Sequence, residues 1–198
     1  MNGLKRPQLV LASRSPRRRE LLTEAGYEFT IVVPGDAAEC GICSRETPEE
    51  LVARLARQKA ADIVPRIAGG LVVACDTVVE CEGQILGKPA NEEHARQMLQ
   101  RLSGREHRVL SGLCLWNVPD GGPQVRIAVT RLRMDRLSAA EIDDYLASGL
   151  WDGKAGAFGY QDRLGWVHIV EGSESNIVGL PLEMLAEMLG ETTRELRS

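Results

Sequence analysis

Residues 8–22 read QLVLASRSPRRRELL, a short apolar run that leads through a serine-containing turn into a cluster of arginines. The apolar run predicts a buried strand over residues 8–12. Ser15 is a good helix N-cap, and Pro16 suits the first helical position because the N–H that it lacks would have no partner there. We therefore expect a helix after this turn, ending at Gly26.

The first turn of this expected helix carries positive charge, although the unpaired N–H groups of a helix N-terminus favour Asp or Glu. Arg17, Arg18 and Arg19 stand in that turn, and Arg14 comes shortly before it. A solvated basic surface is one interpretation. The other is a phosphate site, for which a strand, a serine-containing turn and a helix N-terminus are the usual parts. The position of the turn at the end of a strand favours phosphate binding.

Strand and helix patterns alternate along the rest of the chain, without a repeat or a low-complexity linker. We expect further strands over residues 29–33, 71–80, 84–86, 108–117, 124–135 and 166–171, helices opened by Thr47, Asn91 and Ser138, and a last helix over residues 181–189. Residues 172–181 are interpreted as the loop that enters this last helix. The order predicts a mixed α/β fold, a single domain over residues 1–198 with a long twisted sheet flanked by helices.

The composition limits the classes of function. A formal net charge of −4 over 198 residues argues against a dedicated nucleic-acid binder. An RNA-binding module is further disfavoured because three Trp, three Tyr and two Phe offer few rings for base stacking. The sequence shows no signal segment and no apolar run long enough to span a bilayer, so we expect a cytoplasmic protein without a membrane partner.

The five cysteines are odd in number, and Cys75, Cys81 and Cys114 lie within apolar runs. This pattern predicts reduced, packed thiols rather than a disulfide framework. Cys40 and Cys43 form a C-x-x-C pair, but a zinc site would need further ligands nearby. We interpret this pair as an incidental feature of a loop.

Asp76 interrupts the apolar run of residues 71–79. A carboxylate buried in a strand is costly unless it is paired or binds a metal. An Asp that bonds neighbouring amides at a bulge is the alternative. Lys88 follows at the end of the paired hairpin strand, close enough across the turn to lie near Asp76, which favours a functional role. The spacing from Gly83 to Lys88 lacks the residues of a Walker phosphate loop.

Lysine is rare in this arginine-rich chain, which suggests that an interior lysine supplies a compact, single-point charge. Lys59 is expected on a helix, where extension of its ammonium to the surface is the alternative. Lys154 and Gln161 lie in a glycine-rich stretch. Glycines allow a backbone to approach a ligand closely, and the Gln amide can bind a base edge. An ordinary glycine-rich turn is the alternative here.

Taken together, these motifs resemble the Maf-type nucleoside triphosphate pyrophosphatases from Leu9 to about Leu189. The matching stretches are residues 11–22, 54–60, 74–79, 86–89, 102–107, 152–161 and 178–182. The resemblance implies an inosine-triphosphatase-like fold with a central cleft and hydrolysis of a nucleoside triphosphate to the monophosphate and pyrophosphate. It also implies a divalent cation, Mg²⁺ or Mn²⁺, and a homodimer.

The resemblance carries over to particular positions. It implies that Asp76 accepts a proton, that Lys59 and Lys88 assist catalysis, and that Glu39 and Asp76 hold the metal. The substrate-binding positions are matched by Ser13, Arg17, Arg18, Thr77, Lys154 and Gln161. Among them, Arg17, Thr77 and Gln161 match the specificity positions of members that hydrolyse dTTP and UTP.

Two alternatives stay open from the sequence. The same chemistry on 7-methyl-GTP or another modified nucleotide is the first. The second is a non-catalytic, nucleotide-binding regulator of cell division, since the family name suggests a role in septum formation.

Overall fold

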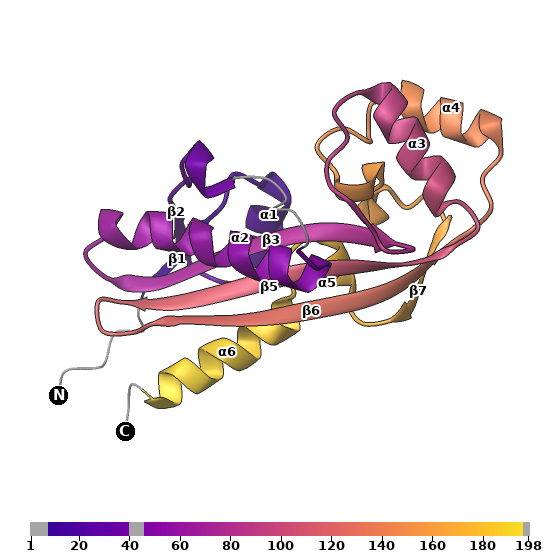
Figure 1. Ribbon diagram of the computed structural model, residues 1–198. Coiled ribbons are helices and arrows are strands. Elements are labelled where there is room, and N and C mark those ends of the chain that lie inside the picture. Colours follow the sequence, from indigo (N-terminus) through magenta and orange to yellow (C-terminus); the bar gives the residue numbers. More distant parts are fainter. Residues whose placement is uncertain (1–7, 40–45, 196–198) are drawn as a thin grey trace.

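The computed structural model describes residues 8–39 and 46–195, which form a mixed α/β fold on one seven-stranded sheet (Figure 1). The strands are β1 (Leu9–Ala12), β2 (Phe29–Ile31), β3 (Gly70–Cys81), β4 (Gln84–Leu86), β5 (Glu106–Val118), β6 (Pro123–Met134) and β7 (Val167–Glu171). The helices are α1 (Pro16–Glu24), α2 (Pro48–Ile63), α3 (Glu92–Leu102), α4 (Ala139–Ala147), α5 (Glu174–Val178) and α6 (Leu182–Glu195). Short 3-10 turns are η1 (Asp36–Glu39), η2 (Val64–Arg66), η3 (Ala155–Ala157) and η4 (Tyr160–Asp162).

The sheet has the strand order β2-β1-β3-β5-β6-β7, with β4 paired to the end of β3. β1 runs parallel to β2 and β3, whereas the pairs from β3 to β7 are antiparallel. β3 and β5 are long and pair along most of their length, from Gly70 opposite Val118 to Glu80 opposite Arg108. This arrangement confirms the predicted long mixed sheet flanked by helices.

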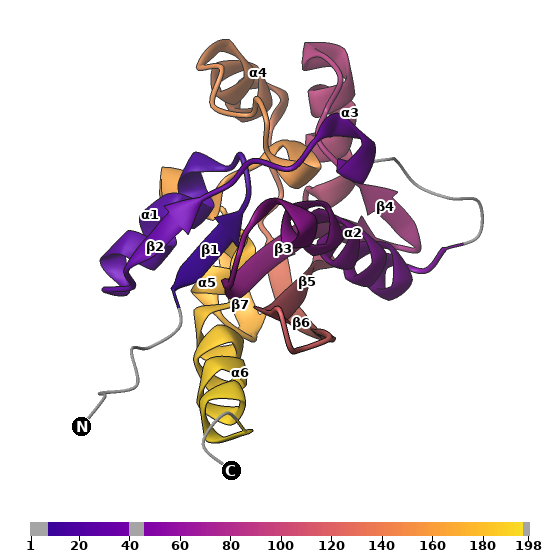
Figure 2. The same cartoon turned by 90° about the vertical axis from the view of Figure 1, so that its left-hand side faces the viewer.

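The inner strands are buried on both faces, which explains why β1 reads as a continuous apolar run. Leu9 and Leu11 belong to a core with α1 and α6, while Val10 and Ala12 pack with Ala56 of α2. Helices α2 and α6 therefore cover opposite faces of the sheet (Figures 1 and 2).

Helices α3 and α4 lie together beyond this part of the sheet and form a second lobe (Figure 1). Its core combines Leu99 of α3, Tyr145 of α4, Leu132 of β6 and Val79 of β3. Phe158, which follows η3, packs into the same core. The ends of β3, β5 and β6 therefore connect the two lobes.

The predicted helix caps are confirmed. The Ser15 side chain accepts a hydrogen bond from the Arg18 N–H, and the Asn91 side chain caps α3 in the same way. Thr47 and Ser138 form complete capping boxes at the starts of α2 and α4. These features depend on neighbouring residues alone, so local sequence rules are sufficient to find them.

Two predictions near the C-terminus are wrong. Residues 172–181, expected as a loop, contain α5, which Ser173 caps through the Asn176 N–H. A helix of five residues is too short to show apolar periodicity. The last helix, expected to end near Leu189, continues to Glu195. Cys40 and Cys43 lie outside the described residues.

Candidate active site

A cavity of about 600 Å³, called the cleft below, lies where the β1–α1 turn, α2, β3 and the segment after α4 meet. The sequence-predicted site residues that line it are Ser13, Arg17, Arg18, Lys59, Asp76, Thr77, Lys88, Lys154 and Gln161. Side chains from distant parts of the chain thus share one cavity, as the sequence predicts. Their individual roles stay predictions.

The cleft is basic although the chain carries a net charge of −4. Among the described residues that line it, the basic ones are Arg14, Arg17, Arg18, Lys59, Lys88 and Lys154, and the acidic ones are Asp76 and Asp152. This excess of positive charge suits a polyanionic ligand such as a chain of phosphates.

Asp76 is paired with Lys59. Lys59 Nζ donates to Asp76 Oδ1 at 2.6 Å, and the two side chains are only 7% and 15% exposed. The sequence pointed to Lys88 as the nearby cation; Lys88 lines the same cleft, but its side chain is exposed. Helix α2 therefore supplies the bonded cation, and Lys88 stands closer to solvent.

Gly112 explains how α2 comes close enough to make this contact. It lies opposite Asp76 in the β3–β5 pair. A Cβ at this position would lie 2.2 Å from the Val52 carbonyl oxygen, so only glycine lets the backbone of α2 rest on the strand. No sequence motif indicates this role, because it depends on which strand α2 covers.

Arg18 ties the start of α1 to β3 and α5. Its Nε donates to the Gly179 carbonyl oxygen at 2.7 Å, and one Nη donates to Thr77 Oγ1 at 3.1 Å. Thr77 Oγ1 in turn shares a 2.8 Å hydrogen bond with Ser111, which is fully buried. Sequence reasoning missed Ser111, because only the pairing of β3 with β5 brings it to Thr77.

Arg17 reaches across the cleft in the other direction. One Nη donates to the Gly153 carbonyl oxygen at 3.0 Å, which links α1 to the segment after α4. Burial, and after it the neighbouring charge of Arg18, lowers the pKa of Arg17 from its usual value. Two guanidinium groups thus face the same small volume, an arrangement that an anion between them would stabilise.

Lys154 is buried in the wall of the cleft and is bonded to Asp162. Asp162 is not among the residues that the sequence predicts for the site. A carboxylate eight residues after a lysine has no helical or strand spacing that predicts contact, and the turns η3 and η4 bring the two together.

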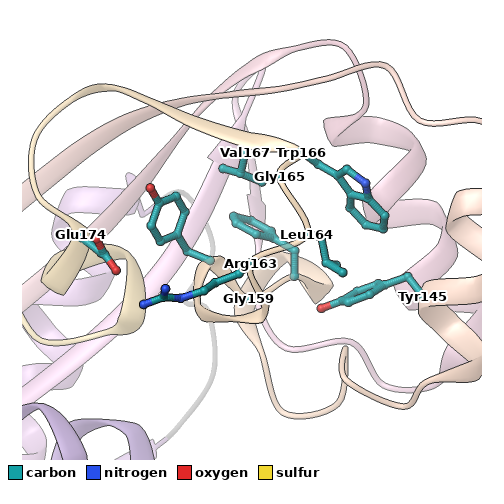
Figure 3. A pocket seen from close by; sticks show the side chains of 10 residues that line it. Tyr145, Gly159, Arg163, Leu164, Gly165, Trp166, Val167 and Glu174 are labelled. Atoms are coloured by element: carbon teal, nitrogen blue, oxygen red, sulfur yellow. The ribbon is translucent and has the colours of Figure 1, made fainter.

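A second, smaller cavity of about 380 Å³ lies between Tyr145 of α4 and Glu174 of α5 (Figure 3). Tyr145 and Trp166 line it and meet edge to face, with ring centroids 5.4 Å apart. Phe158 lines both this cavity and the cleft, so one ring forms part of the wall between them.

The carboxylates of the cleft determine whether a divalent cation fits. Within residues 8–39 and 46–195, no group of three or more His, Cys, Asp or Glu side chains could hold a metal. Glu39, the expected second ligand, ends η1, but its side chain lies outside the described part of the chain. Mg²⁺ usually binds through one or two carboxylates together with substrate phosphates. Asp76 therefore fits a cation shared with a polyphosphate, not a cation enclosed by protein.

The cysteines that the structure describes are consistent with reduced thiols. Cys75, Cys81 and Cys114 are free and buried. Burial raises the pKa of each thiol, and that of Cys114 rises to about 12.

None of the helices in the described segments has the length and apolar character of a membrane span.

Comparison with known proteins gives one family and one fold. The sequence model of the family described as Maf-like protein matches residues 8–192. A dTTP/UTP pyrophosphatase of Rhodopirellula baltica is 57% identical over 182 residues, which cover 91% of this chain and 80% of that protein. A dTTP/UTP pyrophosphatase of Geotalea uraniireducens is 44% identical, over 88% of this chain and 89% of that protein.

A solved structure of a HAM1 protein from Coxiella burnetii resembles the fold. Its TM-score is 0.51 at 18% sequence identity, over 93% of this chain and 99% of that chain. At this identity the likeness concerns the arrangement of the backbone alone.

Proposed function

The chain belongs to the Maf-like protein family, and from this premise we propose that it hydrolyses dTTP and UTP to the monophosphate and pyrophosphate. The family relatives named dTTP/UTP pyrophosphatases support the substrate. The structural observation that carries the proposal is one basic cleft in which Asp76 lies among six arginines and lysines.

The cations are assigned to the phosphate chain. Arg17 and Arg18 line the cleft from the start of α1, Lys88 lines it from the segment after β4, and Lys154 lies in its wall. Charge develops on the pyrophosphate as the bond to the α-phosphorus breaks, and fixed guanidinium and ammonium groups stabilise that charge without reorganising. Arg18 is already held by its bonds to Gly179 and Thr77, so its position does not depend on the substrate.

Asp76 is assigned as the proton acceptor for the attacking water. Lys59 binds Oδ1 and so fixes the rotation of the carboxylate. The other oxygen, Oδ2, is the one that we assign to the water. Asp76, with Glu39 as the second expected ligand, would also hold Mg²⁺ or Mn²⁺ against the phosphate oxygens, and this cation would polarise the phosphate when bound.

Recognition of the base is assigned to Gln161 and Thr77. Gln161 is exposed at the cleft, where its amide can both donate to and accept from a pyrimidine edge. The Thr77 hydroxyl is bonded to Arg18 and Ser111. We propose that Thr77 contributes to specificity by holding Arg18 in place.

A substrate screen tests this function. The protein is incubated with dTTP, UTP, 7-methyl-GTP and dATP in the presence of Mg²⁺ or Mn²⁺, and monophosphate and pyrophosphate are measured. We expect both products from dTTP and UTP at much higher rates than from the purine nucleotides. Faster release from 7-methyl-GTP would favour the modified-nucleotide alternative. Tight binding of dTTP without any turnover would favour a nucleotide-binding regulator.

A cytoplasmic location and a homodimer stay predictions of this proposal. Sedimentation of the purified protein would give its oligomeric state.

A further inference from the structure

Asp162 lies next to the wall of the cleft and binds Lys154 with both carboxylate oxygens. Lys154 Nζ donates to Oδ1 at 2.6 Å and to Oδ2 at 2.5 Å. The Lys154 side chain is 10% exposed and that of Asp162 is 6% exposed. Lys154 lines the cleft, whereas Asp162 is absent from the described lining of both cavities. Asp162 therefore acts on the cleft indirectly, through its hydrogen bonds to Lys154.

Tyr145 holds Asp162 from the other side. Its hydroxyl donates to Oδ2 at 2.7 Å, and the Tyr145 residue is 3% exposed. Burial, and after it the bond to Asp162, raises the pKa of Tyr145, so the hydroxyl keeps its proton and remains a donor. The Tyr145 ring extends from α4 into the wall of the second cavity (Figure 3). The orientation of Asp162 is therefore set by the second lobe.

Gly159 restricts the pair further. A Cβ at this position would lie 2.6 Å from Lys154 Nζ and 2.7 Å from Asp162 Oδ2, so the backbone passes directly against both charged groups. An ammonium has three N–H groups. Two hydrogen bonds join the Lys154 ammonium to Asp162, and a third N–H is available to a ligand in the cleft, which Lys154 lines.

The field of Asp162 also acts on a second cation of the cleft. Burial, and then Arg18, lowers the pKa of Arg17, and the negative charge of Asp162 opposes this lowering. Arg17 in addition donates to the carbonyl oxygen of Gly153, the residue before Lys154. Asp162 therefore acts electrostatically on two of the groups that we assign to the phosphates.

We propose that Asp162 is a positioning residue for nucleotide hydrolysis: it fixes the Lys154 ammonium so that one N–H points at the phosphates, and Tyr145 locks the carboxylate. The inference rests on the proposed function for the nature of the bound phosphates. A pair with a purely structural role would stabilise the fold and leave phosphate affinity unchanged.

A double-mutant cycle tests the proposal. Asp162→Asn, Lys154→Met and the double variant are compared for KM and kcat with dTTP, and for the Kd of inorganic pyrophosphate by calorimetry. We expect Asp162→Asn to raise KM and the pyrophosphate Kd roughly tenfold or more, because the two residues are in direct contact. In the Lys154→Met background, Asp162→Asn should have little further effect, since no ammonium is left to position.

Tyr145→Phe covers the case in which Asp162→Asn does not fold, because it removes one hydroxyl and leaves the ion pair in place. It should raise KM in the same direction by a smaller factor. Asp144→Asn, at an exposed position beside Tyr145 on α4, is the matched control and should leave KM unchanged.

Two results would overturn the role of Asp162. One is an unchanged KM and pyrophosphate Kd in Asp162→Asn or Tyr145→Phe together with a lower melting temperature. The other is full additivity in the double variant. If the wild-type protein releases no pyrophosphate from dTTP or UTP, the proposed function fails, and the pyrophosphate affinities still decide whether Asp162 acts through Lys154.

Discussion

Two lysine–aspartate pairs lie at the cleft, Lys59–Asp76 and Lys154–Asp162. They differ in whether the carboxylate itself lines the cleft. In the first pair both Lys59 and Asp76 line the cleft, whereas in the second pair Lys154 lines it and Asp162 lies behind it. Both pairs are largely buried. Removing one partner of a buried pair leaves an uncompensated charge, at a cost of roughly 3–5 kcal/mol. In each pair, burial of the two charges costs free energy, and the ion pair holds both side chains in one position.

Asp76→Asn tests the assignment at the first pair. The amide keeps the size of the side chain but accepts a proton poorly, so kcat for dTTP should fall roughly 10²–10⁴-fold, the usual contribution of a general base. The measurement is the initial rate of pyrophosphate release at saturating dTTP. Asp120→Asn, at an exposed position between β5 and β6, should keep wild-type turnover. Near-normal kcat in a folded Asp76→Asn protein would remove Asp76 from the mechanism.

At the scale of elements, residues close in the sequence were enough to predict where helices begin. Contacts between residues far apart in the sequence could not be predicted. Serine, threonine and asparagine caps predicted where α1, α2, α3 and α4 begin, because a cap and its N–H partner are three residues apart in the chain. Seven of the nine cleft residues were selected from sequence patterns, and Ser13 and Thr77 were added by the family resemblance. Three residues were not predicted, because no short motif encodes their positions. The pairing of β3 with β5 brings Ser111 and Gly112 to the site, and the turns η3 and η4 bring Asp162 there.

Gly112→Ala tests how strongly the packing of α2 on β5 supports the site. The added methyl group would lie 2.2 Å from the Val52 carbonyl oxygen, so the helix has to move. We expect a loss of roughly 1–3 kcal/mol in the free energy of unfolding, typical of an overpacked core, together with lower kcat because Lys59 moves with the helix. Urea unfolding and pyrophosphate release give the two values.

Gly122→Ala is the matched control for that substitution. A Cβ at Gly122 meets nothing within 4 Å, so both stability and turnover should stay close to wild type. Equal stability of the two variants would mean that α2 does not rest on β5 as closely as the structure shows.

At the scale of the whole molecule, the cleft is a product of complete folding. It draws on the β1–α1 turn, α2, β3, the segment after α4 and the end of α5, and both lobes contribute to its walls. No single segment carries the positive charge that this acidic chain concentrates there. Substrate affinity should therefore depend on conditions that loosen the contact between the lobes, and the core of the second lobe contains one group that responds to pH.

His107 is that group. It is 3% exposed, its ring meets Phe158 edge-on with centroids 5.4 Å apart, and its Nε2 has no hydrogen-bond partner among the described residues. Burial lowers its pKa from 6.5 to about 4. Because the folded pKa lies below the unfolded one, the unfolded chain binds more protons, and the stability contributed by neutral His107 is present above pH 6.5 and lost as the pH falls toward 4.

His107→Gln removes this titration and tests the argument. Between pH 7.5 and pH 5, the wild-type protein should lose about 2 kcal/mol more unfolding free energy than the variant, as the shifted pKa requires. Urea unfolding at both pH values gives the difference. Parallel pH profiles for wild type and His107→Gln would show that His107 does not titrate as a buried neutral group. The unfolding free energy of the wild-type protein is expected to fall more steeply with falling pH than that of the variant. If pyrophosphate affinity falls over the same pH range, the contact between His107 and Phe158 helps to hold the cleft wall in place.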